Sequence, residues 1–261
     1  MYPPSNRRRF PSVHFRPGHV FWMSRGATWL NRDKPRPFVL ITNCSSGAPG
    51  TLVYGSTQQT EARSGAACVH VEPRSGGVNR NGLRERTAFY PGILLRKFYE
   101  QLPPHAGTVG VSLEALRSAL RTALGIEAGS CLRAGAPAGS RRGRIVRLER
   151  RLARALRTRF AVILTEPHYS RAEHYQLILP LRPDDGSSIT SRVLRLSSGE
   201  WTKVFPPSTQ SVLLPIPLVH SIWHRLAIDD ETPYVLDEAS LDQIDRRLCE
   251  FFSLAPPGAA S

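Results

Sequence analysis

An arginine and a pair of hydroxyl residues stand at the ends of two neighbouring apolar runs. Arg36 begins RPFVLIT, and Ser56 and Thr57 close GTLVYGST. An arginine supplies fixed positive charge and forked donors for phosphoryl oxygens, and adjacent strands can bring residues this far apart onto one rim of a sheet. Each residue alone also fits a structural role, because an edge arginine can lie over apolar surface and a hydroxyl pair can form a turn.

A second basic feature is the segment RRGRIVRLERRLARALRTR, residues 141–159, which holds nine arginines. Ile145, Leu148, Leu152 and Leu156 stand near helical spacing. The segment therefore fits an arginine-rich helix that follows an RNA backbone, or a solvated helix packed through its leucines. It also fits a first strand at 143–148 followed by a loop. The arginines expected to bind RNA are Arg147, Arg150, Arg151, Arg154 and Arg159.

The composition favours an anionic partner. The chain has 35 Lys plus Arg against 21 Asp plus Glu, a formal charge of +14, and most of the basic residues are arginine. The planar arginine fork holds phosphate oxygens in two-point contacts. A GC-rich genome, whose codons favour arginine, explains the same excess.

Cysteine usage and apolar runs bound the cellular context. The four cysteines lie far apart, with neither CxxC nor His-Cys ligand spacing, which predicts a reduced interior and no metal site. The apolar runs are too short for a signal peptide or a membrane span. We therefore expect a soluble, cytoplasmic protein that does not enter a membrane.

The two halves of the chain repeat the same order of elements. RPFVLIT (36–42) matches RFAVILT (159–165) in character. Candidate first strands, GHVFWMSR and GRIVRLER, precede them, and candidate third strands, GTLVYGS and YQLILPL, follow them. Each half closes with an amphipathic helix, for which Ser112 and Ser240 are the expected N-caps. This order predicts a β-rich fold in which a small β-barrel with helices is used twice.

The expected domain organisation follows the repeat. It comprises an N-terminal tail at 1–17, a barrel with the candidate site at 18–127, an Ala/Gly/Ser/Arg linker at 128–142, a second and degenerate barrel at 143–254, and a C-terminal tail at 255–261.

This arrangement resembles the PemK/MazF family of toxin endoribonucleases. In the first half the resemblance rests on a Gly-led first strand, a loop ending in Arg-Pro, the strand FVLIT, a third strand running into Ser-Thr-Gln, and a closing helix. In the second half it rests on SVLLPIPLVHSIWHRL and VLDEASLDQIDRRLCEFF. The resemblance implies SH3-like barrels that cut single-stranded RNA at specific sequences without a metal or cofactor. It also implies homodimers held inactive by an antitoxin, as in type II toxin–antitoxin systems.

The resemblance also assigns residues. Arg36 takes the family's catalytic arginine position and Ser56 its catalytic hydroxyl position, with Thr57 beside it. RNA cleavage by this route requires the ribose 2′-hydroxyl to attack the adjacent phosphorus, so an arginine stabilises the charge that builds on the phosphoryl oxygens. Trp22 is expected in the core. The remaining expected RNA contacts are Trp29, Arg32, Lys34 and Gln58.

Both halves depart from the family's pattern. Arg159 fills the Arg36 position, but LILPLRPDD places Leu181 and Arg182 where Ser and Thr would stand, so we expect no chemistry there. In the first half, His19 stands where the family commonly carries an acidic residue. Two fused barrels predict an intramolecular pseudo-dimer or a homodimer, with an acidic antitoxin as a further partner. The alternative is a catalytically decayed RNA-binding or regulatory protein of the same fold.

Overall fold

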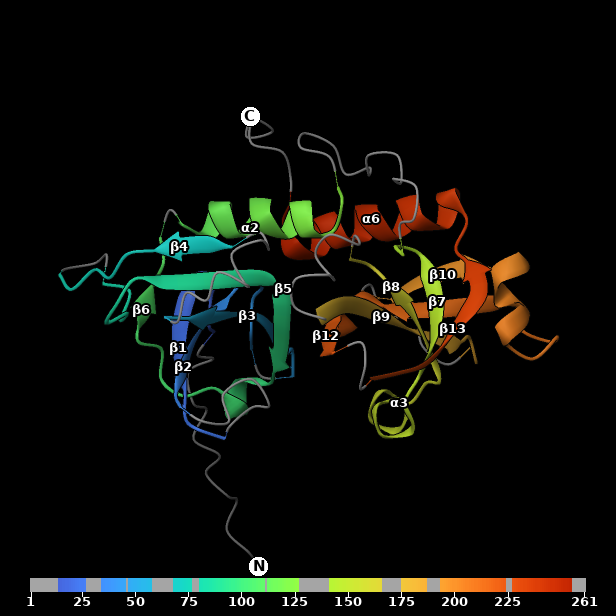
Figure 1. The fold of residues 1–261 in the computed structure, drawn as a ribbon, viewed down its shortest axis with the longest axis horizontal. Helices are drawn as coiled ribbons and strands as arrows, with labels where there is room; N and C mark the ends of the chain where they lie inside the picture. The colour runs from blue at the N-terminus through green and yellow to red at the C-terminus, as the bar shows by residue number, and fades with distance from the viewer. Residues whose placement is uncertain are drawn as a thin grey trace, which may run out of the picture.

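The computed structural model describes residues 14–26, 34–45, 47–57, 68–76, 80–110, 112–126, 141–165, 175–186, 193–223 and 227–254. In these ranges the protein is β-rich, with two antiparallel sheets and three α-helices (Figure 1). We call residues 14–126 the first half and residues 141–254 the second half. Trp29, Arg32 and Gln58 lie outside the described residues, as do most of the expected tails and linker.

The first half forms a six-stranded sheet with the order β4-β5-β3-β2-β1-β6. Alternate side chains enter two different cores. Phe38 and Tyr54 pack in one cluster, whereas Val39 and Val53 pack in the other, as the period of two along a strand requires. Its elements are β1 (His19–Met23), β2 (Arg36–Leu40), β3 (Gly50–Ser56), β4 (Val69–Val71), β5 (Thr87–Lys97), η2 (Tyr99–Gln101), β6 (Gly107–Thr108) and α2 (Ser112–Ala123).

The second half forms a seven-stranded sheet with the order β10-β11-β9-β8-β7-β13, and β12 also pairs with β9. Its elements are β7 (Arg144–Leu148), α3 (Arg150–Leu156), β8 (Phe160–Ile163), β9 (Tyr175–Pro183), β10 (Val193–Ser197), η3 (Glu200–Val204), β11 (Ser211–Pro215), η4 (Ile216–Leu218), β12 (His220–Trp223), β13 (Ile228–Val235) and α6 (Glu238–Phe252).

The repeat seen in the sequence recurs in the hydrogen bonds. Each half has a glycine with positive φ before its first strand. Each also has a threonine whose hydroxyl accepts a hydrogen bond from a backbone N–H group of the third strand. The matching bonds are Gly18 N to Leu40 O (2.7 Å) with Gly143 N to Ile163 O (2.8 Å), and Thr51 N to Thr42 Oγ1 (2.9 Å) with Leu177 N to Thr165 Oγ1 (2.5 Å). The two halves therefore share one local backbone arrangement over their first three strands.

These bonds correct the alignment of the third strands. Because Leu177 occupies the place of Thr51, Ser56 corresponds to Arg182 and Thr57 to Pro183. Leu181, expected opposite Ser56, corresponds to Gly55. The alignment of the third strands predicted from the sequence was shifted by one residue. The run YQLILPL starts one residue earlier, relative to the strand, than the run GTLVYGS.

The arginine-rich segment is a strand followed by a helix. Ile145 and Leu148 are buried in β7, which pairs with β8 and β13. Glu149 then caps α3, since its carboxylate accepts hydrogen bonds from the backbone N–H groups of Arg151 (2.8 Å) and Leu152 (3.3 Å). A single helix through the whole segment is thus wrong, because tertiary pairing of the strand overrides the helical spacing.

The two halves meet at a bulge in β5. Val53 pairs with Leu94 but Tyr54 pairs with Tyr90, so residues 91–93 leave the ladder. Ser221 of β12 satisfies the backbone groups that this bulge releases. Its Oγ accepts from Leu94 N at 2.6 Å and donates to Gly92 O at 2.9 Å. Buried backbone polar groups need such partners, so the second half completes the hydrogen bonding of the first.

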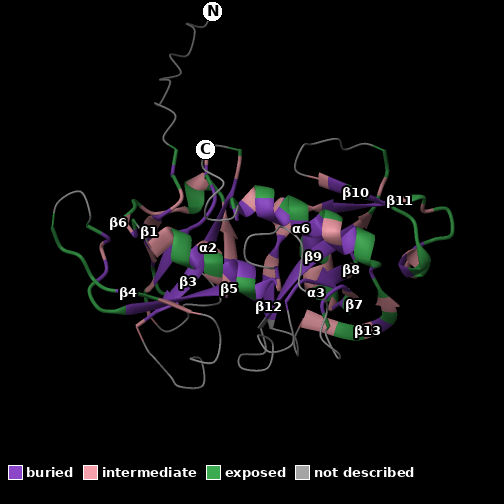
Figure 2. Cartoon of the chain, turned by 90° about the horizontal axis from the view of Figure 1, so that it is seen from above, coloured by how far each residue is buried: buried purple, intermediate pink, exposed green. Residues whose placement is uncertain are grey.

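Helices α2 and α6 lie on the same side of the molecule (Figures 1 and 2). Their apolar faces belong to one core cluster that draws residues from both halves. The apolar positions expected from the helical period are buried at Leu116, Leu120 and Leu124 in the first half and at Leu241, Ile244 and Leu248 in the second, whereas Leu113 is partly buried. The N-cap of α6 is Asp237 instead of Ser240, because the Asp237 carboxylate already accepts from Ser240 N at 2.8 Å.

A buried ion pair joins the same helices. The guanidinium of Arg142 pairs with the carboxylate of Asp245 on α6, and both side chains are fully buried. Arg142 Nε also donates to the carbonyl oxygen of Leu124, just beyond α2, at 2.8 Å. Arg142 was expected in the linker, but it belongs to the packed structure.

The length and hydropathy of the helices in the described ranges were compared with those of a membrane-spanning helix. None of them is both long enough and apolar enough to cross a bilayer.

Candidate functional site

Arg36 and Ser56 are in direct contact. β2 and β3 are neighbours, and the pairing of Phe38 with Tyr54, continued two residues outward, sets Arg36 opposite Ser56. Arg36 Nη1 donates a hydrogen bond to Ser56 Oγ at 2.9 Å. Ser56 is fully buried, so its hydroxyl holds the guanidinium from the protein side and leaves the outer face of the arginine toward the adjoining pocket.

A pocket of about 330 Å³ adjoins this contact, and we call it the Arg36 pocket. Thr57 lines it, whereas Ser56 lies behind it. Two further basic side chains, Lys34 and Arg84, also line it, and Glu85 is the one carboxylate among its described lining residues. The pocket thus combines three cationic groups, a hydroxyl and a carboxylate, the groups that position a phosphodiester and move a proton.

Trp22 forms an aromatic wall of the Arg36 pocket. Its indole Nε1 donates to the carbonyl oxygen of Gly82 at 2.9 Å, and the guanidinium carbon of Arg84 lies 6.0 Å from the ring centroid. Trp22 was expected in the core. It packs against the core with part of its surface and also lines the pocket, where its ring offers a stacking surface.

The loop that carries Arg84 and Glu85 is anchored by Asn81, which is buried. Asn81 Nδ2 donates to Glu72 O at 2.7 Å, while its Oδ1 accepts from the backbone N–H groups of Arg74 (3.0 Å) and Leu83 (3.1 Å). These bonds satisfy the side-chain amide inside the fold and fix the loop against the segment that follows β4. The pocket wall is therefore pre-organised.

Gly55 permits the close approach of strands behind the pocket. A Cβ atom on Gly55 would lie 2.6 Å from the ring of Phe89 and 3.0 Å from the carbonyl oxygen of Pro37. A larger residue would push β5 or β2 away from β3. The glycine immediately before Ser56 thus keeps Ser56 within reach of Arg36.

His19 lies elsewhere. Its ring stacks on that of His105, with 4.3 Å between centroids and 10° between planes, and it does not line the Arg36 pocket. Burial, then the charges of His105 and Arg16, lower the pKa of His19. The departure from the family's acidic residue therefore falls outside the pocket.

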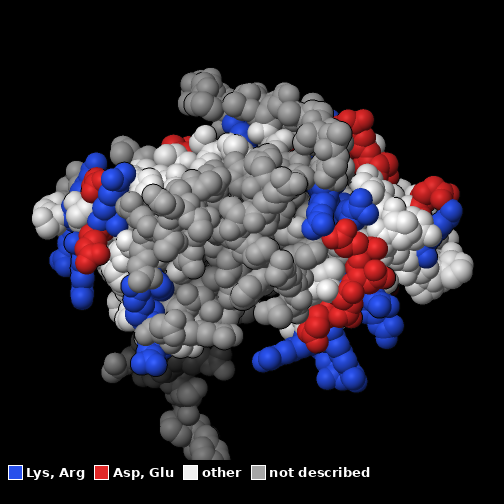
Figure 3. Space-filling model, in the orientation of Figure 1, with Lys and Arg blue, Asp and Glu red and all other residues white. Residues whose placement is uncertain are grey.

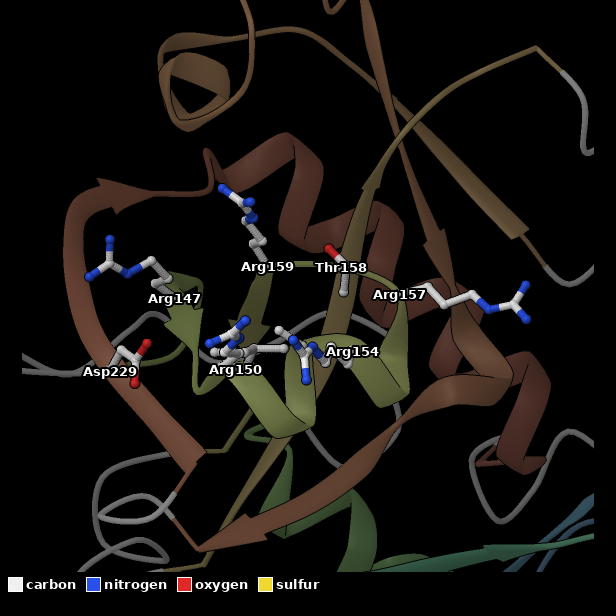
Figure 4. A pocket seen from close by; sticks show the side chains of 9 residues that line it. Arg147, Arg150, Arg154, Arg157, Thr158, Arg159 and Asp229 are labelled. Atoms are coloured by element: carbon white, nitrogen blue, oxygen red, sulfur yellow. The ribbon is translucent and has the colours of Figure 1, made fainter.

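A larger pocket, of about 730 Å³, occupies the second half, and we call it the arginine pocket (Figure 4). It is bounded by α3 and by β7 and β13, beside the start of β8. Arg159 stands directly before β8, as Arg36 begins β2. Of the five arginines of segment 141–159 expected to bind RNA, Arg151 alone is absent from the described lining. The charged lining residues are Arg147, Arg150, Arg154, Arg157, Arg159 and Asp229.

Arg182 replaces the hydroxyl of Ser56 in this half. Its Nη2 donates to the carbonyl oxygen of Leu156, at the end of α3, at 2.6 Å. Burial, and then the charge of Arg157, lower the pKa of Arg182. A guanidinium has no acceptor for Arg159, so the contact that fixes Arg36 has no equivalent here.

The chain was compared with models of known protein families, with curated proteins and with solved structures. No match was found. The site is therefore interpreted from its own geometry. Among the described residues, no group of three or more His, Cys, Asp or Glu side chains is placed to hold a metal ion.

The structure brings together four of the expected first-half residues and adds three. Arg36, Ser56, Thr57 and Lys34 meet at one pocket, which Trp22, Arg84 and Glu85 complete. Nothing in the sequence marks Arg84 or Glu85, because they reach the pocket through a loop that Asn81 holds. Trp22 carries a signal, since it stands one residue before the end of the first strand and thus near the rim that Arg36 occupies.

Proposed function

We propose that this chain is a PemK/MazF-type endoribonuclease that cleaves single-stranded RNA without a metal, and that its active site is the Arg36 pocket. The observation that carries the proposal is the hydrogen bond between Arg36 and Ser56, which holds a guanidinium at the edge of a pocket lined by further cations. Such a fixed cation stabilises the charge that develops on a phosphoryl group without reorganisation during the reaction.

The reaction assigned to this site is an internal transesterification. The ribose 2′-oxygen forms a bond to phosphorus while the bond from phosphorus to the 5′-oxygen breaks, giving a 2′,3′-cyclic phosphate and a free 5′-hydroxyl. Arg36 binds the phosphoryl oxygens, and Thr57 donates a hydrogen bond to the same phosphate. Glu85 accepts the proton of the 2′-hydroxyl, since it is the carboxylate of the pocket, and the leaving 5′-oxygen takes a proton from solvent water.

The same proposal gives the sheets a finer description, as two SH3-like barrels that form a pseudo-dimer within one chain. The repeated hydrogen bonds of the first three strands support it, as do Ser221 in the bulge of β5 and the Arg142–Asp245 pair. A toxin of this type acts with an antitoxin, and an acidic protein is the complement to a chain with a formal charge of +14.

A second candidate function is RNA binding without cleavage. The loss of the hydroxyl partner of Arg159 favours it for the second half. It would extend to the whole chain if the Arg36 pocket bound RNA without cutting it.

The test is incubation of the full chain with a long single-stranded RNA in EDTA, followed by analysis of the product ends. We expect cuts at a short recurring sequence, with 2′,3′-cyclic phosphate ends. A 2′-deoxy substitution at the cut nucleotide should abolish the cut, because it removes the nucleophile. Binding without cuts would replace the first candidate with the second, and products with other ends would refute the mechanism.

A further inference from the structure

The arginine pocket gathers five arginines in one lining. Across the described ranges, Arg147, Arg150 and Arg154 have no ion-pair partner within the protein, and neither do Arg157 and Arg159. Several arginines elsewhere do have such partners, as Arg141 and Arg144 with Glu231, Arg195 with Asp184, and Arg247 with Glu250. Asp229 is the one carboxylate among the described lining residues, so the five arginines repel one another, and an anionic ligand relieves that repulsion.

The guanidinium groups come from several elements. Arg147 lies on β7, Arg150 and Arg154 lie on α3, and Arg159 stands before β8. Figure 4 shows Arg147 and Arg150 extending to the same side of the pocket, near Asp229, while Arg157 points away from them. Figure 3 shows the basic side chains projecting at the lower edge of the second half, beside a band of acidic ones. The charge is thus spread along a surface and does not converge on one atom.

The lining identifies the class of anion. The apolar lining residues are Leu148 and Ala153, and no aromatic residue is among the described ones. Leu148 is buried, so the pocket offers little apolar surface of the kind that forms the core of a protein interface. The described lining therefore offers no aromatic platform on which a base can stack. What it offers is forked donors that match phosphate oxygens.

Arg182 adds to the positive field. It occupies the place of Ser56 and lies close enough to Arg157 for the two charges to interact. In the first half, the equivalent residue is a neutral hydroxyl that holds Arg36. The substitution therefore exchanges a residue that fixes one arginine for one that increases the local positive charge.

We propose that the arginine pocket is a second RNA site that binds the phosphodiester backbone of a single strand without reading its bases and without cleaving it. The proposal rests on the proposed function only in taking the ligand to be RNA. In this arrangement the Arg36 pocket reads and cuts the strand, whereas the arginine pocket holds a flanking stretch and raises affinity.

The test uses the full chain and an uncleavable single-stranded 2′-O-methyl RNA, with binding followed by fluorescence anisotropy at several salt concentrations. The pocket variant is Arg147→Gln/Arg150→Gln. The control is Arg246→Gln/Arg247→Gln, which removes the same charge from exposed positions of α6 outside the pocket lining. Thermal melting checks that each variant is folded, and a scrambled oligonucleotide checks sequence dependence.

We expect the pocket variant to bind about tenfold more weakly and the slope of log K against log salt to fall by roughly 1.4, as the loss of two phosphate contacts on a single strand predicts. The control should keep the wild-type slope, and scrambling the sequence should not change the loss. Equal losses in both variants would overturn the proposal, because they would show a general effect of charge.

Two further outcomes separate this inference from the proposed function. If the wild type binds RNA through the arginine pocket but cuts none, the proposed function fails and the second RNA site is supported. If the wild type cuts RNA and the pocket variant binds like the control, the second site fails and the proposed function stands. Poly-glutamate that binds through the same arginines in place of RNA would overturn the proposal in favour of an acidic protein ligand.

Discussion

The two halves place an arginine at the same point of the same strand arrangement and surround it differently. Arg36 is held by Ser56 beside a pocket of about 330 Å³ with an aromatic wall. Arg159 has Arg182 in the equivalent position, beside a pocket of about 730 Å³ lined by other arginines. The residue opposite the arginine decides whether the guanidinium is fixed in one geometry or contributes to a diffuse positive surface.

The residue immediately before Ser56 also differs from its counterpart in the second half. Gly55 lets Phe89 and Pro37 approach β3, which brings Ser56 within hydrogen-bond reach of Arg36. Its counterpart Leu181 fills the space with a buried side chain. The first half thus leaves the space that the contact between Arg36 and Ser56 needs, whereas the second half fills the corresponding space with an apolar side chain.

The largest effect is expected from breaking the buried ion pair that links the two halves. Arg142→Met leaves the carboxylate of Asp245 buried without its partner, so the free energy of unfolding should fall by about 3–5 kcal/mol. Urea denaturation measures it. Arg142→Met/Asp245→Leu should recover most of the loss, and Arg141→Met, which breaks an exposed pair, should have little effect. A small loss for Arg142→Met would show that the pair does not join the halves.

Truncating the side chain opposite the arginine should lower the rate of RNA cleavage in the first half, at Ser56, but not at the equivalent position of the second half. Ser56→Ala should lower the cleavage rate about 10- to 100-fold, as the loss of a hydrogen bond to a charged group predicts. Single-turnover cleavage measures the change. Arg182→Ala, at the equivalent position of the second half, should leave the rate unchanged. Similar losses in both variants would end the distinction between the halves.

Filling the space at Gly55 should weaken the first half. Gly55→Ala should cost about 1–3 kcal/mol of stability, because its Cβ would overlap the ring of Phe89. Gly92→Ala in β5, where a Cβ would meet nothing within 4 Å, is the control. Thermal melting of both proteins tests the prediction, which is wrong if Gly55→Ala is no less stable than Gly92→Ala.

The smallest effect is expected from acid at the contact between the halves. Burial, and then the charge of Arg96 on β5, lower the pKa of His220 on β12 to about 4. The unfolded chain binds this proton near pH 6.5, so the neutral ring favours the folded state above that pH. This stability is lost as the pH falls from about 6.5 toward 4.

The expected size of this loss is modest near neutrality. Lowering the pH from about 7 to about 6 should cost about 0.7 kcal/mol through His220 alone. Urea denaturation of the wild type and of His220→Gln at both pH values measures the difference. An equal pH dependence in the two proteins would show that His220 does not titrate in this window.

The sequence predicted the elements whose patterns are local. The apolar run from Arg36 and the leucines of α2 and α6 have the periods of a buried strand and of amphipathic helices, and they adopt those structures. The contact of Arg36 with Ser56 was also predictable, because consecutive antiparallel strands bring their ends together.

What the sequence could not show depends on packing between distant segments. Glu85 reaches the pocket because Asn81 anchors a loop, and Arg142 is buried because Asp245 lies 103 residues further along the chain. The register of β9 was misjudged by one residue because an apolar run does not mark its own first paired residue. Each of these features is set by a tertiary contact that leaves no periodic signal.

The most direct test of the central claim compares Arg36→Ala with Arg159→Ala in EDTA, with saturating single-stranded RNA. Both variants remove the arginine from the equivalent strand position, and both should remain folded by circular dichroism. We predict that Arg36→Ala lowers the cleavage rate by about 10²–10³, the loss typical of a fixed donor to a developing anion, while Arg159→Ala keeps the wild-type rate. Equal losses, or a larger loss for Arg159→Ala, would contradict the assignment of the chemistry to the first half.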